Sequence, residues 1–203
     1  MLHYESIPEA VHELLTSLAR SAVVDGFALG GGTSLALRFG HRISVDLDFF
    51  TEVGFEAGEL TRREGFPSTH TVVGRSEGSL TIACGDVKID FLRHAYPVLE
   101  PLEIEDGVRL LSLADVTAMK LNAIANRGSK KDFFDLVRIL DELSLDACLD
   151  LFEKKYLNTD RFVAIRSLVW FEDAEEEPAP VVPTGLGWGE VKQRIRGEVS
   201  RLG

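Results

Sequence analysis

The chain is poor in cysteine and in positive charge, and it has no long apolar run. Its two cysteines, Cys84 and Cys148, lie far apart and form no CxxC pair, so we expect buried free thiols and no cysteine-based metal or redox centre. No run approaches the roughly 18 apolar residues of a membrane span, and the N-terminus lacks the apolar region of a signal peptide. These absences predict a cytoplasmic protein without a membrane segment.

Positive charge is scarce because 22 Lys and Arg residues stand against 33 Asp and Glu residues, which gives a formal net charge of -11. This balance argues against a protein that coats nucleic acid non-specifically, although it leaves room for a local basic patch. The length of 203 residues suits one good-sized domain, or one domain with a helical extension.

The hydrophobic pattern changes character along the chain, from strand-like alternation to helical periodicity near residue 112. We therefore expect an α+β fold, with a mixed sheet and flanking helices over residues 1–111 and a helical subdomain over residues 112–203. The expected strands are 27–29, 43–50, 69–73, 79–84, 87–92 and 108–111, with the third to fifth forming an antiparallel meander. The expected helices are 8–24, 33–39, 56–64, 113–126, 130–142, 145–157, 160–170 and 189–201.

Residues 27–50 contain a glycine-rich turn that is suited to binding phosphate. Gly31 and Gly32 let the chain turn sharply and bring backbone N–H groups close to an anion. A helix starting near Thr33 adds its N-terminal dipole, and the hydroxyls of Thr33 and Ser34 are further donors. On its own, the same pattern also fits a tight strand-to-helix turn with no ligand.

Two better-known phosphate motifs are missing from this turn. It lacks the Lys-Ser/Thr pair of a Walker P-loop, and Leu35 stands where the dinucleotide fingerprint has its third glycine. After the turn, Arg42 and Ser44 are candidates for contacts with a phosphate. The alternative is that both belong to an exposed loop.

Asp46 and Asp48 follow the turn and are the first candidate metal ligands. Residues two apart on a strand share a face, so the two carboxylates should lie side by side while Val45, Leu47 and Phe49 face the core. Like charges this close repel each other unless a cation lies between them. Oxygen ligands favour Mg²⁺ or Mn²⁺. A lone Asp-x-Asp is equally compatible with a solvated strand end.

A third carboxylate is present on the expected strand 87–92. Asp90 shares a face with Lys88 and Leu92, opposite the apolar face of that strand. If this strand lies beside 43–50, Asp90 joins Asp46 and Asp48, and three carboxylates can hold two Mg²⁺ ions roughly 4 Å apart. By itself, Asp90 also fits the description of a strand-end acid.

The helical half carries two further pairs of charged residues. Lys120 and Arg127 are seven residues apart and share a helix face, where they would suit the β- and γ-phosphates of a nucleotide. Asp132 and Asp135 are three apart near the start of the next helix. The alternative for the two aspartates is stabilisation by the helix dipole or by salt bridges to neighbouring lysines.

Together these residues resemble the polymerase-β-like nucleotidyltransferase superfamily. That pattern is a Gly-Gly-Thr/Ser turn, about a dozen residues, Asp-x-Asp and a later strand aspartate; here thirteen residues separate Gly32 from Asp46. More narrowly, GGTSLALRFGHRISVDLDFF resembles the AbiEii/AbiGii-type toxin family. LSLADVTAMKLNAIANRGSKKDFFDLVRIL resembles the later motifs of that family, which include Lys120, Arg127, Asp132 and Asp135.

The resemblance implies a nucleotidyltransferase that uses an NTP, with Mg²⁺ or Mn²⁺ held by the three carboxylates. Its catalytic residues would be Asp46, Asp48, Asp90, Lys120 and Asp132. Its nucleotide-binding residues would be Gly31, Gly32, Thr33, Ser34, Arg42, Ser44, Lys120, Arg127 and Asp135. The family context is the toxin of a toxin–antitoxin or phage-defence pair, with an RNA such as tRNA, or a protein, as acceptor and a transcriptional regulator as cognate antitoxin.

Two other readings stay open at this stage. The first is transfer of the nucleotide to a small molecule, as in antibiotic-modifying relatives, because the net charge of -11 disfavours an RNA acceptor. The second is a non-catalytic, nucleotide-binding regulatory module that has kept the fold. The presence of all three carboxylates argues against the second reading.

Overall fold

A computed structural model describes residues 1–202, which form two compact units. Unit 1 comprises residues 1–40, 44–97 and 101–111, and unit 2 comprises residues 41–43, 98–100 and the chain from Ser112 onward. The main change of unit thus falls between Leu111 and Ser112. Two short segments, 41–43 and 98–100, belong to unit 2 although they interrupt the sequence of unit 1.

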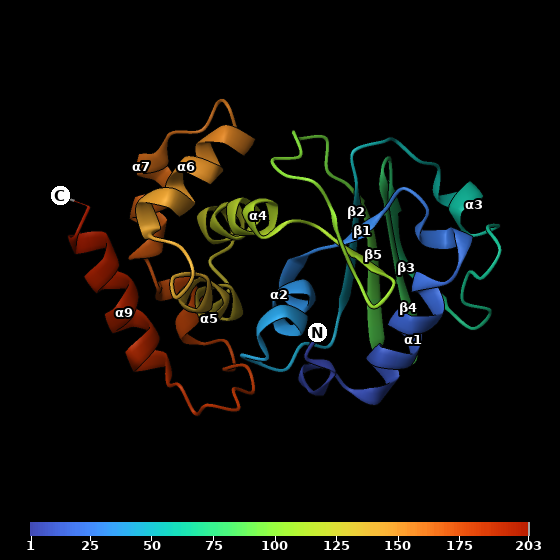
Figure 1. Ribbon diagram of the computed structural model, residues 1–203, viewed down its shortest axis with the longest axis horizontal. Coiled ribbons are helices and arrows are strands. Elements are labelled where there is room, and N and C mark those ends of the chain that lie inside the picture. The colour runs from blue at the N-terminus through green and yellow to red at the C-terminus, as the bar shows by residue number, and fades with distance from the viewer. Residues whose placement is uncertain (203) are drawn as a thin grey trace. The chain divides into compact units, whose positions relative to one another are not determined.

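Unit 1 contains a seven-stranded mixed sheet with the strand order β3-β4-β5-β2-β1-β7-β6 (Figure 1). The strands are β1 (Ala28–Leu29), β2 (Leu47–Thr51), β3 (Thr71–Ser76), β4 (Ser79–Cys84), β5 (Val87–Arg93), β6 (Glu103–Glu105) and β7 (Val108–Leu110). The mixed α/β fold class is as predicted. Strand β6 was not predicted, because Glu103-Ile104-Glu105 is short and its residues are mostly exposed.

The predicted meander is present, and its last hairpin fixes the position of Asp90. Strands β3, β4 and β5 pair in antiparallel fashion, and only Gly85 and Asp86 separate β4 from β5. A two-residue hairpin loop leaves little freedom in strand register. Thr81 of β4 therefore lies opposite Asp90 of β5.

Strands β2 and β5 run parallel, side by side in the middle of the sheet, as the hypothesis for Asp90 required. Their register places Leu47 beside Ile89, Asp48 beside Asp90, and Phe49 beside Phe91. The apolar members of these pairs are at most 3% exposed and belong to the core of unit 1. Alternation along each strand therefore turns the two aspartates to the opposite face.

Helices of unit 1 pack next to the sheet. These are α1 (Glu9–Ala19), which packs near β7, α2 (Gly31–Phe39), which packs near β2, and the short α3 (Ala57–Leu60). The predicted helix 8–24 is shorter than expected, since α1 ends at Ala19 and a 3-10 turn covers Ala22–Val24. Helix α2 ends as predicted at Gly40, which has the left-handed conformation (φ 62°) of a glycine C-cap.

Unit 2 is helical. It comprises α4 (Leu113–Asn126), α5 (Lys130–Ile139), α6 (Leu145–Lys155), α7 (Arg161–Leu168), α8 (Glu172–Glu175) and α9 (Trp188–Ser200). Helix α4 packs against α5, α6 and α7. Short α8 lies between the predicted helices 160–170 and 189–201 and was not itself predicted.

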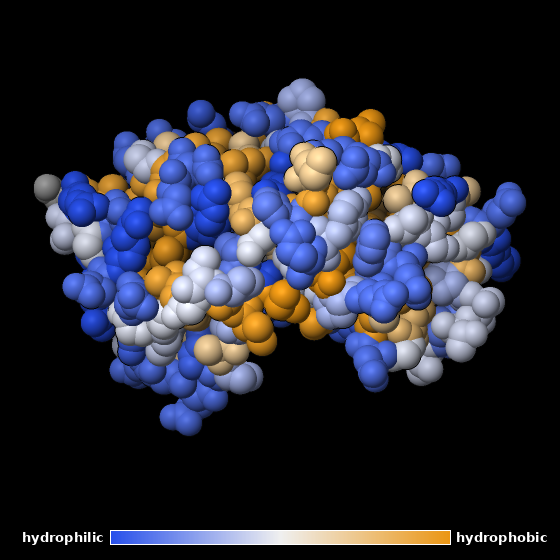
Figure 2. Space-filling view, turned by 60° about the horizontal axis from the view of Figure 1, so that its bottom comes forward, coloured by the Kyte–Doolittle hydropathy of each residue, from blue (hydrophilic) through white to orange (hydrophobic). Residues whose placement is uncertain are grey.

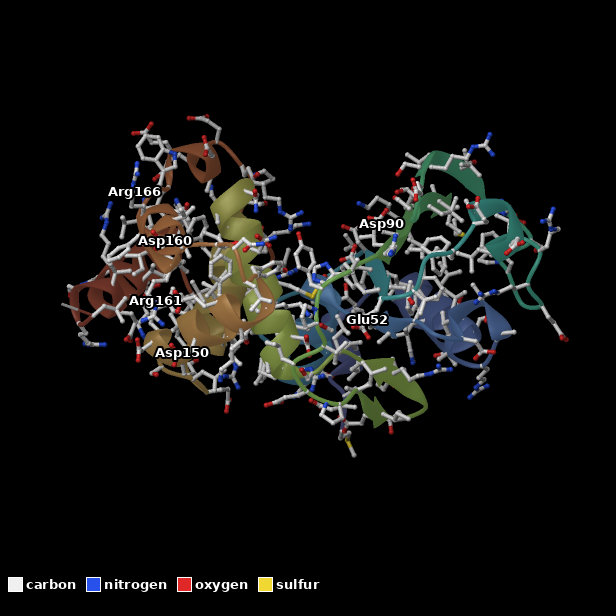
Figure 3. All side chains as sticks on the ribbon, turned by 90° about the horizontal axis from the view of Figure 1, so that it is seen from above. Glu52, Asp90, Asp150, Asp160, Arg161 and Arg166 are labelled. Carbon is white, nitrogen blue, oxygen red and sulfur yellow. The ribbon has the colours of Figure 1, made fainter. Side chains whose placement is uncertain are left out.

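Acidic and basic side chains connect helices within unit 2. Arg161 at the start of α7 forms ion pairs with Asp146, Asp150 and Glu153 of α6, at 3.3, 2.5 and 3.0 Å. Figure 3 labels Arg161 and Asp150, which lie close together there. These side chains are partly exposed, so each pair contributes little to stability by itself.

A buried ion pair marks the start of α4. The Ser112 hydroxyl accepts a hydrogen bond from the Asp115 backbone N–H (3.0 Å), so Ser112 is the N-cap of α4. The Asp115 carboxylate is fully buried and lies 2.6 Å from the ammonium group of Lys155, and it accepts hydrogen bonds from the backbone N–H groups of Leu99 and Glu100. Asp115 thereby attaches segment 98–100 to the helices of unit 2.

Apolar side chains are also found at the surface. Hydrophilic residues cover most of the face seen in Figure 2, with apolar side chains visible between them. Val45, which was predicted to face the core, is 49% exposed because it precedes the first residue of β2 and has no strand partner to cover it. Among residues 1–202, no helix is long and apolar enough to cross a membrane.

Candidate active site

The carboxylate cluster of unit 1 comprises Asp46, Asp48 and Asp90. Asp48 and Asp90 occupy paired positions on the parallel strands β2 and β5, whose backbones are about 4.8 Å apart in such a pair. Asp46 lies two residues before Asp48, immediately ahead of β2. The sheet therefore brings Asp48 and Asp90 to neighbouring positions, and Asp46 lies close to Asp48 along the chain.

The glycine turn lies directly against this cluster. Gly31 has a positive φ (62°), and a Cβ added to it would collide with the carboxylate of Asp48. The preceding residue, Gly30, donates its backbone N–H to the Asp48 carbonyl (2.9 Å), and a Cβ there would meet the ring of Phe50 at 2.7 Å. Helix α2 begins at Gly31, so the N–H groups of its first turn lie next to a carboxylate cluster.

The three hydroxyls predicted to contact phosphate have partners inside unit 1. Thr33 Oγ1 donates to the Asp46 carbonyl and lies 2.9 Å from Ser44 Oγ. Ser34 Oγ donates to the Gly31 carbonyl (3.0 Å). All three residues are buried, so their hydroxyls hold the glycine turn against the chain before β2. Backbone N–H groups of Gly31 and Gly32 are the better candidates for anion binding.

Asp90 is held by two neighbours in the described structure. The Thr81 hydroxyl donates to Oδ1 of Asp90 (2.5 Å), and the ammonium group of Lys88 lies 2.8 Å from Oδ2 (Figure 3 labels Asp90). Neither Thr81 nor Lys88 was predicted as a site residue. The two-residue hairpin between β4 and β5 was the signal for Thr81, since it fixes Thr81 opposite Asp90.

Lys88 lies in the electric field of the whole carboxylate cluster. Its hydrogen bond to Asp90 raises the pKa of Lys88 most, partial burial acts in the opposite direction, and the charges of Asp90, Asp48 and Asp46 raise it further. In the conformation described for residues 1–202, no three Asp, Glu, His or Cys side chains are grouped so that they could hold a metal ion. The donor set of the cluster nevertheless suits Mg²⁺ or Mn²⁺, because it offers only carboxylate oxygens.

Gly31→Ala should therefore damage the cluster and the stability of unit 1 together. We expect a loss of about 1–3 kcal/mol in the free energy of unfolding, because the variant forces a left-handed conformation on alanine and pushes Asp48 aside. Urea denaturation followed by far-UV circular dichroism measures this loss. Gly58→Ala in α3 is the matched control, since a Cβ there meets nothing within 4 Å and should stabilise slightly. Equal stability of the two variants would contradict the prediction.

Unit 2 contains a second group of charged residues, the buried charge network of His41, Arg42, Lys120, Arg127, Asp132 and Asp135. Asp135 is completely buried and receives bidentate hydrogen bonds from Arg42, at 2.7 Å from Nε and 3.0 Å from Nη2. Nε2 of His41 lies 2.8 Å from the same carboxylate. Arg42, predicted to contact a phosphate, is 3% exposed and is a partner of Asp135.

Lys120 joins the two aspartates of α5. Its ammonium group lies 2.7 Å from Asp132 and 2.7 Å from Asp135, and its side chain is 5% exposed. Arg127 contacts the other side of Asp132, with Nε at 2.9 Å, but 60% of its side chain is exposed. Lys120 and Arg127 thus both contact Asp132, although Arg127 follows the last residue of α4. Lys120 contacts carboxylates, whereas exposed Arg127 remains a candidate for contacts with a ligand.

Burial and opposite charge compete in setting the pKa values of this network. Burial disfavours the charged form of Asp135, but Arg42 and Lys120 outweigh it and hold the pKa of Asp135 well below its usual range. Asp132 shows the same competition, and Lys120 and Arg127 lower its pKa. Burial lowers the pKa of Lys120 while Asp135 and Asp132 raise it, and the net shift is upward. All three groups are therefore charged at neutral pH.

These shifts predict loss of stability in acid. Groups with a depressed folded-state pKa stabilise the folded protein above their unfolded pKa, which is about 4, and lose this contribution as the pH falls through the folded-state value. The urea midpoint of unit 2 should therefore fall steeply below about pH 4. Both tryptophans, Trp170 and Trp188, lie in unit 2, so their fluorescence measures its unfolding. A midpoint that stays constant down to pH 2.5 would contradict this prediction.

The fold is shared with solved structures of nucleotidyltransferases. The structure is similar to that of JHP933 from Helicobacter pylori, with a TM-score of 0.59 and 16% identity, over 97% of this chain and 93% of that one. It is also similar to MenT4, a nucleotidyltransferase toxin from Mycobacterium tuberculosis, with a TM-score of 0.64 and 18% identity, over 95% of this chain and 81% of that one.

The particular family follows from the sequence. Residues 13–201 match the family described as nucleotidyl transferase AbiEii toxin, type IV toxin–antitoxin system, and the chain belongs to this family. A protein of Aquifex aeolicus described as uncharacterized, aq_aa25, is 37% identical over 171 residues, which cover 81% of this chain and 83% of that protein. The predicted resemblance is thus confirmed.

Proposed function

We propose that this toxin-family nucleotidyltransferase depends on Mg²⁺ and transfers an NMP group from an NTP to a hydroxyl group of an RNA such as tRNA. The observation that carries the proposal is the pairing of Asp48 with Asp90 on parallel strands, directly beside the glycine turn. Bound Mg²⁺ would supply charge stabilisation for the phosphates and the departing pyrophosphate. Asp46, Asp48 and Asp90 would hold it.

The remaining chemistry is assigned to groups of unit 1. The N–H groups at the start of α2 would bind phosphate oxygens, because a helix N-terminus attracts anions. Asp90 would accept the proton of the attacking hydroxyl. A bond then forms between that hydroxyl oxygen and the α-phosphorus, the bond from the α-phosphorus to the bridging oxygen breaks, and pyrophosphate leaves with its electron pair.

The buried charge network of unit 2 supports the proposal in a different way. Lys120 fixes Asp132 and Asp135, and Asp132 in turn orients the exposed side chain of Arg127. We assign Lys120, Asp132, Asp135 and Arg42 to positioning, and Arg127 to contact with the phosphates or the acceptor. A buried, fully paired lysine is poorly placed to bind a ligand unless it first gives up a carboxylate.

The experiment that tests the proposal is transfer of label from an α-labelled NTP. Purified protein with Mg²⁺ should label an RNA in a total cell RNA fraction, and treatment with ribonuclease should remove the label. Each of the four NTPs is tested separately. Label on protein that survives ribonuclease would identify a protein acceptor. No labelled product from any NTP, with extract and metal present, would overturn the proposal.

A small-molecule acceptor is the second candidate, because several basic residues that could bind RNA have partners within the protein. Arg63 donates to backbone carbonyls of residues 22, 23 and 25, and Lys130 is 6% exposed. Lys192 and Arg194 of α9, and Arg201 directly after it, form ion pairs with acidic residues. Affinity for an RNA acceptor should fall steeply with salt, whereas affinity for a small molecule should change little.

The family also implies a partner. We propose that a cognate antitoxin, a transcriptional regulator encoded beside this chain, counteracts its activity and that the pair acts in phage defence. Expression of the chain alone should arrest growth, and coexpression of the neighbouring gene should restore it. Arrest that persists with every neighbouring gene coexpressed would contradict the pairing.

A further inference from the structure

Lys88 occupies a position in the carboxylate cluster that the proposed chemistry does not use. Lys88 and Asp90 are two residues apart on β5 and share a face of the strand, and Asp90 pairs with Asp48 of β2. Asp46 precedes β2, and the charges of Asp90, Asp48 and Asp46 all act on the ammonium group of Lys88. One ammonium group thus lies in the field of three carboxylates.

We propose that Lys88 is a built-in counter-cation of the cluster, which holds Asp90 in the metal-free protein and must be displaced when a divalent cation binds. The proposal rests on the proposed function, because it takes the cluster as the metal site. The contact that carries it is the 2.8 Å ion pair between Lys88 Nζ and Oδ2 of Asp90. A metal ion that binds this oxygen competes directly with the ammonium group.

The surroundings of Asp90 leave Lys88 as the group that moves when a metal ion competes for the carboxylate. Oδ1 already accepts the Thr81 hydroxyl, so Lys88 and Thr81 together engage both oxygens of the carboxylate. The Asp90 side chain is 12% exposed, whereas that of Lys88 is 48% exposed. The lysine can therefore swing into solvent on its flexible stem, while Asp90 stays in the sheet. Displacement of Lys88 requires no movement of the backbone.

A lysine also suits this role chemically. Three carboxylates in one cluster repel one another in the absence of a metal ion, and one ammonium group partly relieves that repulsion. A single positive charge on a mobile side chain attracts the carboxylates less strongly than a divalent ion does. Lys88 thus stabilises the empty cluster and gives way to a metal ion, at the expense of weaker metal binding.

The test is Mn²⁺ binding to the complete chain at constant pH, measured as free Mn²⁺ by electron paramagnetic resonance without nucleotide. Lys88→Met removes the competing charge and should tighten Mn²⁺ binding about two- to fivefold, the range that corresponds to a partly exposed ion pair. Lys88→Arg keeps the charge and should bind Mn²⁺ within about twofold of the unmodified chain. Without metal, Lys88→Met should have a lower melting temperature than the unmodified chain. Added Mn²⁺ should raise the melting temperature of Lys88→Met by more than it raises that of the unmodified chain.

Two control variants locate the effect. Lys154→Met changes the net charge equally at an exposed position of α6, and it should leave Mn²⁺ affinity unchanged. Adding Asp48→Asn to Lys88→Met should abolish the tighter binding, since it removes a ligand of the cluster. Tighter binding in Lys154→Met as well would overturn the proposal, because a general charge effect would then explain it.

The outcomes separate this proposal from the proposed function. If the unmodified chain binds Mn²⁺ and Lys88→Met binds it equally or more weakly, the role of Lys88 is overturned and the metal site stands. If neither protein binds Mn²⁺ at millimolar concentration, both the metal site and the role of Lys88 are overturned. Binding that is detected only in Lys88→Met, or that is tighter there, supports both.

Discussion

Asp48→Asn is expected to reduce nucleotide transfer by at least ~10³-fold while the protein stays folded. The substitution keeps the size of the side chain and removes one negative charge from the centre of the carboxylate cluster. Asp48 is only partly buried, and its backbone bonds to the strand partners of β2 remain. Under the proposed function, Asp48 would be a metal ligand, and its loss would weaken binding of the metal ion that stabilises charge on the phosphates. Initial rates of label transfer from an α-labelled NTP measure the effect.

Asp86→Asn is the matched control for this variant. Asp86 lies in the exposed turn between β4 and β5, in the same unit, and undergoes the same chemical change. Its transfer rate should stay within about twofold of the unmodified chain, as for a surface substitution away from the site. If Asp48→Asn keeps more than a tenth of the original transfer rate at saturating Mg²⁺, the role assigned to Asp48 is contradicted.

Asp135→Asn should have the largest effect on stability, a loss of about 3–5 kcal/mol in the free energy of unfolding of unit 2. The variant removes the carboxylate that buried Arg42 contacts, and it leaves buried Lys120 with Asp132 as its remaining carboxylate. A buried charge that loses its partner retains its desolvation cost, which explains the size of the effect. Tryptophan fluorescence during urea denaturation measures it, because Trp170 and Trp188 both belong to unit 2.

Asp141→Asn provides the comparison for Asp135→Asn. Asp141 follows α5 and forms exposed ion pairs with Arg138 and Arg194, at 3.8 and 3.3 Å. Exposed pairs contribute less than about 1 kcal/mol, so the urea midpoint should hardly move. If Asp135→Asn unfolds at the same urea concentration as Asp141→Asn, the buried charge network does not stabilise unit 2 as its geometry indicates.

The carboxylate cluster was largely predictable because local rules determine it. Strand alternation indicated which face each aspartate takes, and the short hairpin before β5 limited the register of Asp90. The one requirement that local rules do not supply is the parallel pairing of β2 with β5, two strands that lie far apart in the sequence. The family resemblance implied a later strand aspartate in the site, and the structure confirms the pairing.

The roles of the charged residues in unit 2 were harder to predict. Lys120, Arg42 and Asp135 were expected to contact ligand, because a charged residue in a sequence motif suggests an exposed partner. Their partners are one another, and only burial in the folded unit reveals this. Segment 41–43 also carries no sequence signal that assigns it to unit 2, since it follows α2 with no change in composition.

The pairing of β2 with β5 has a further consequence for how reliably active molecules form. A slip of one residue in β2 would bury Asp46 and Asp48 and turn Leu47 and Phe49 out to solvent. Such a chain loses its core along with its site, so a misaligned but compact product is strongly disfavoured. The fraction of refolded molecules that is compact should therefore equal the fraction that is catalytically active. The specific activity should then be the same after refolding from urea and after refolding from acid.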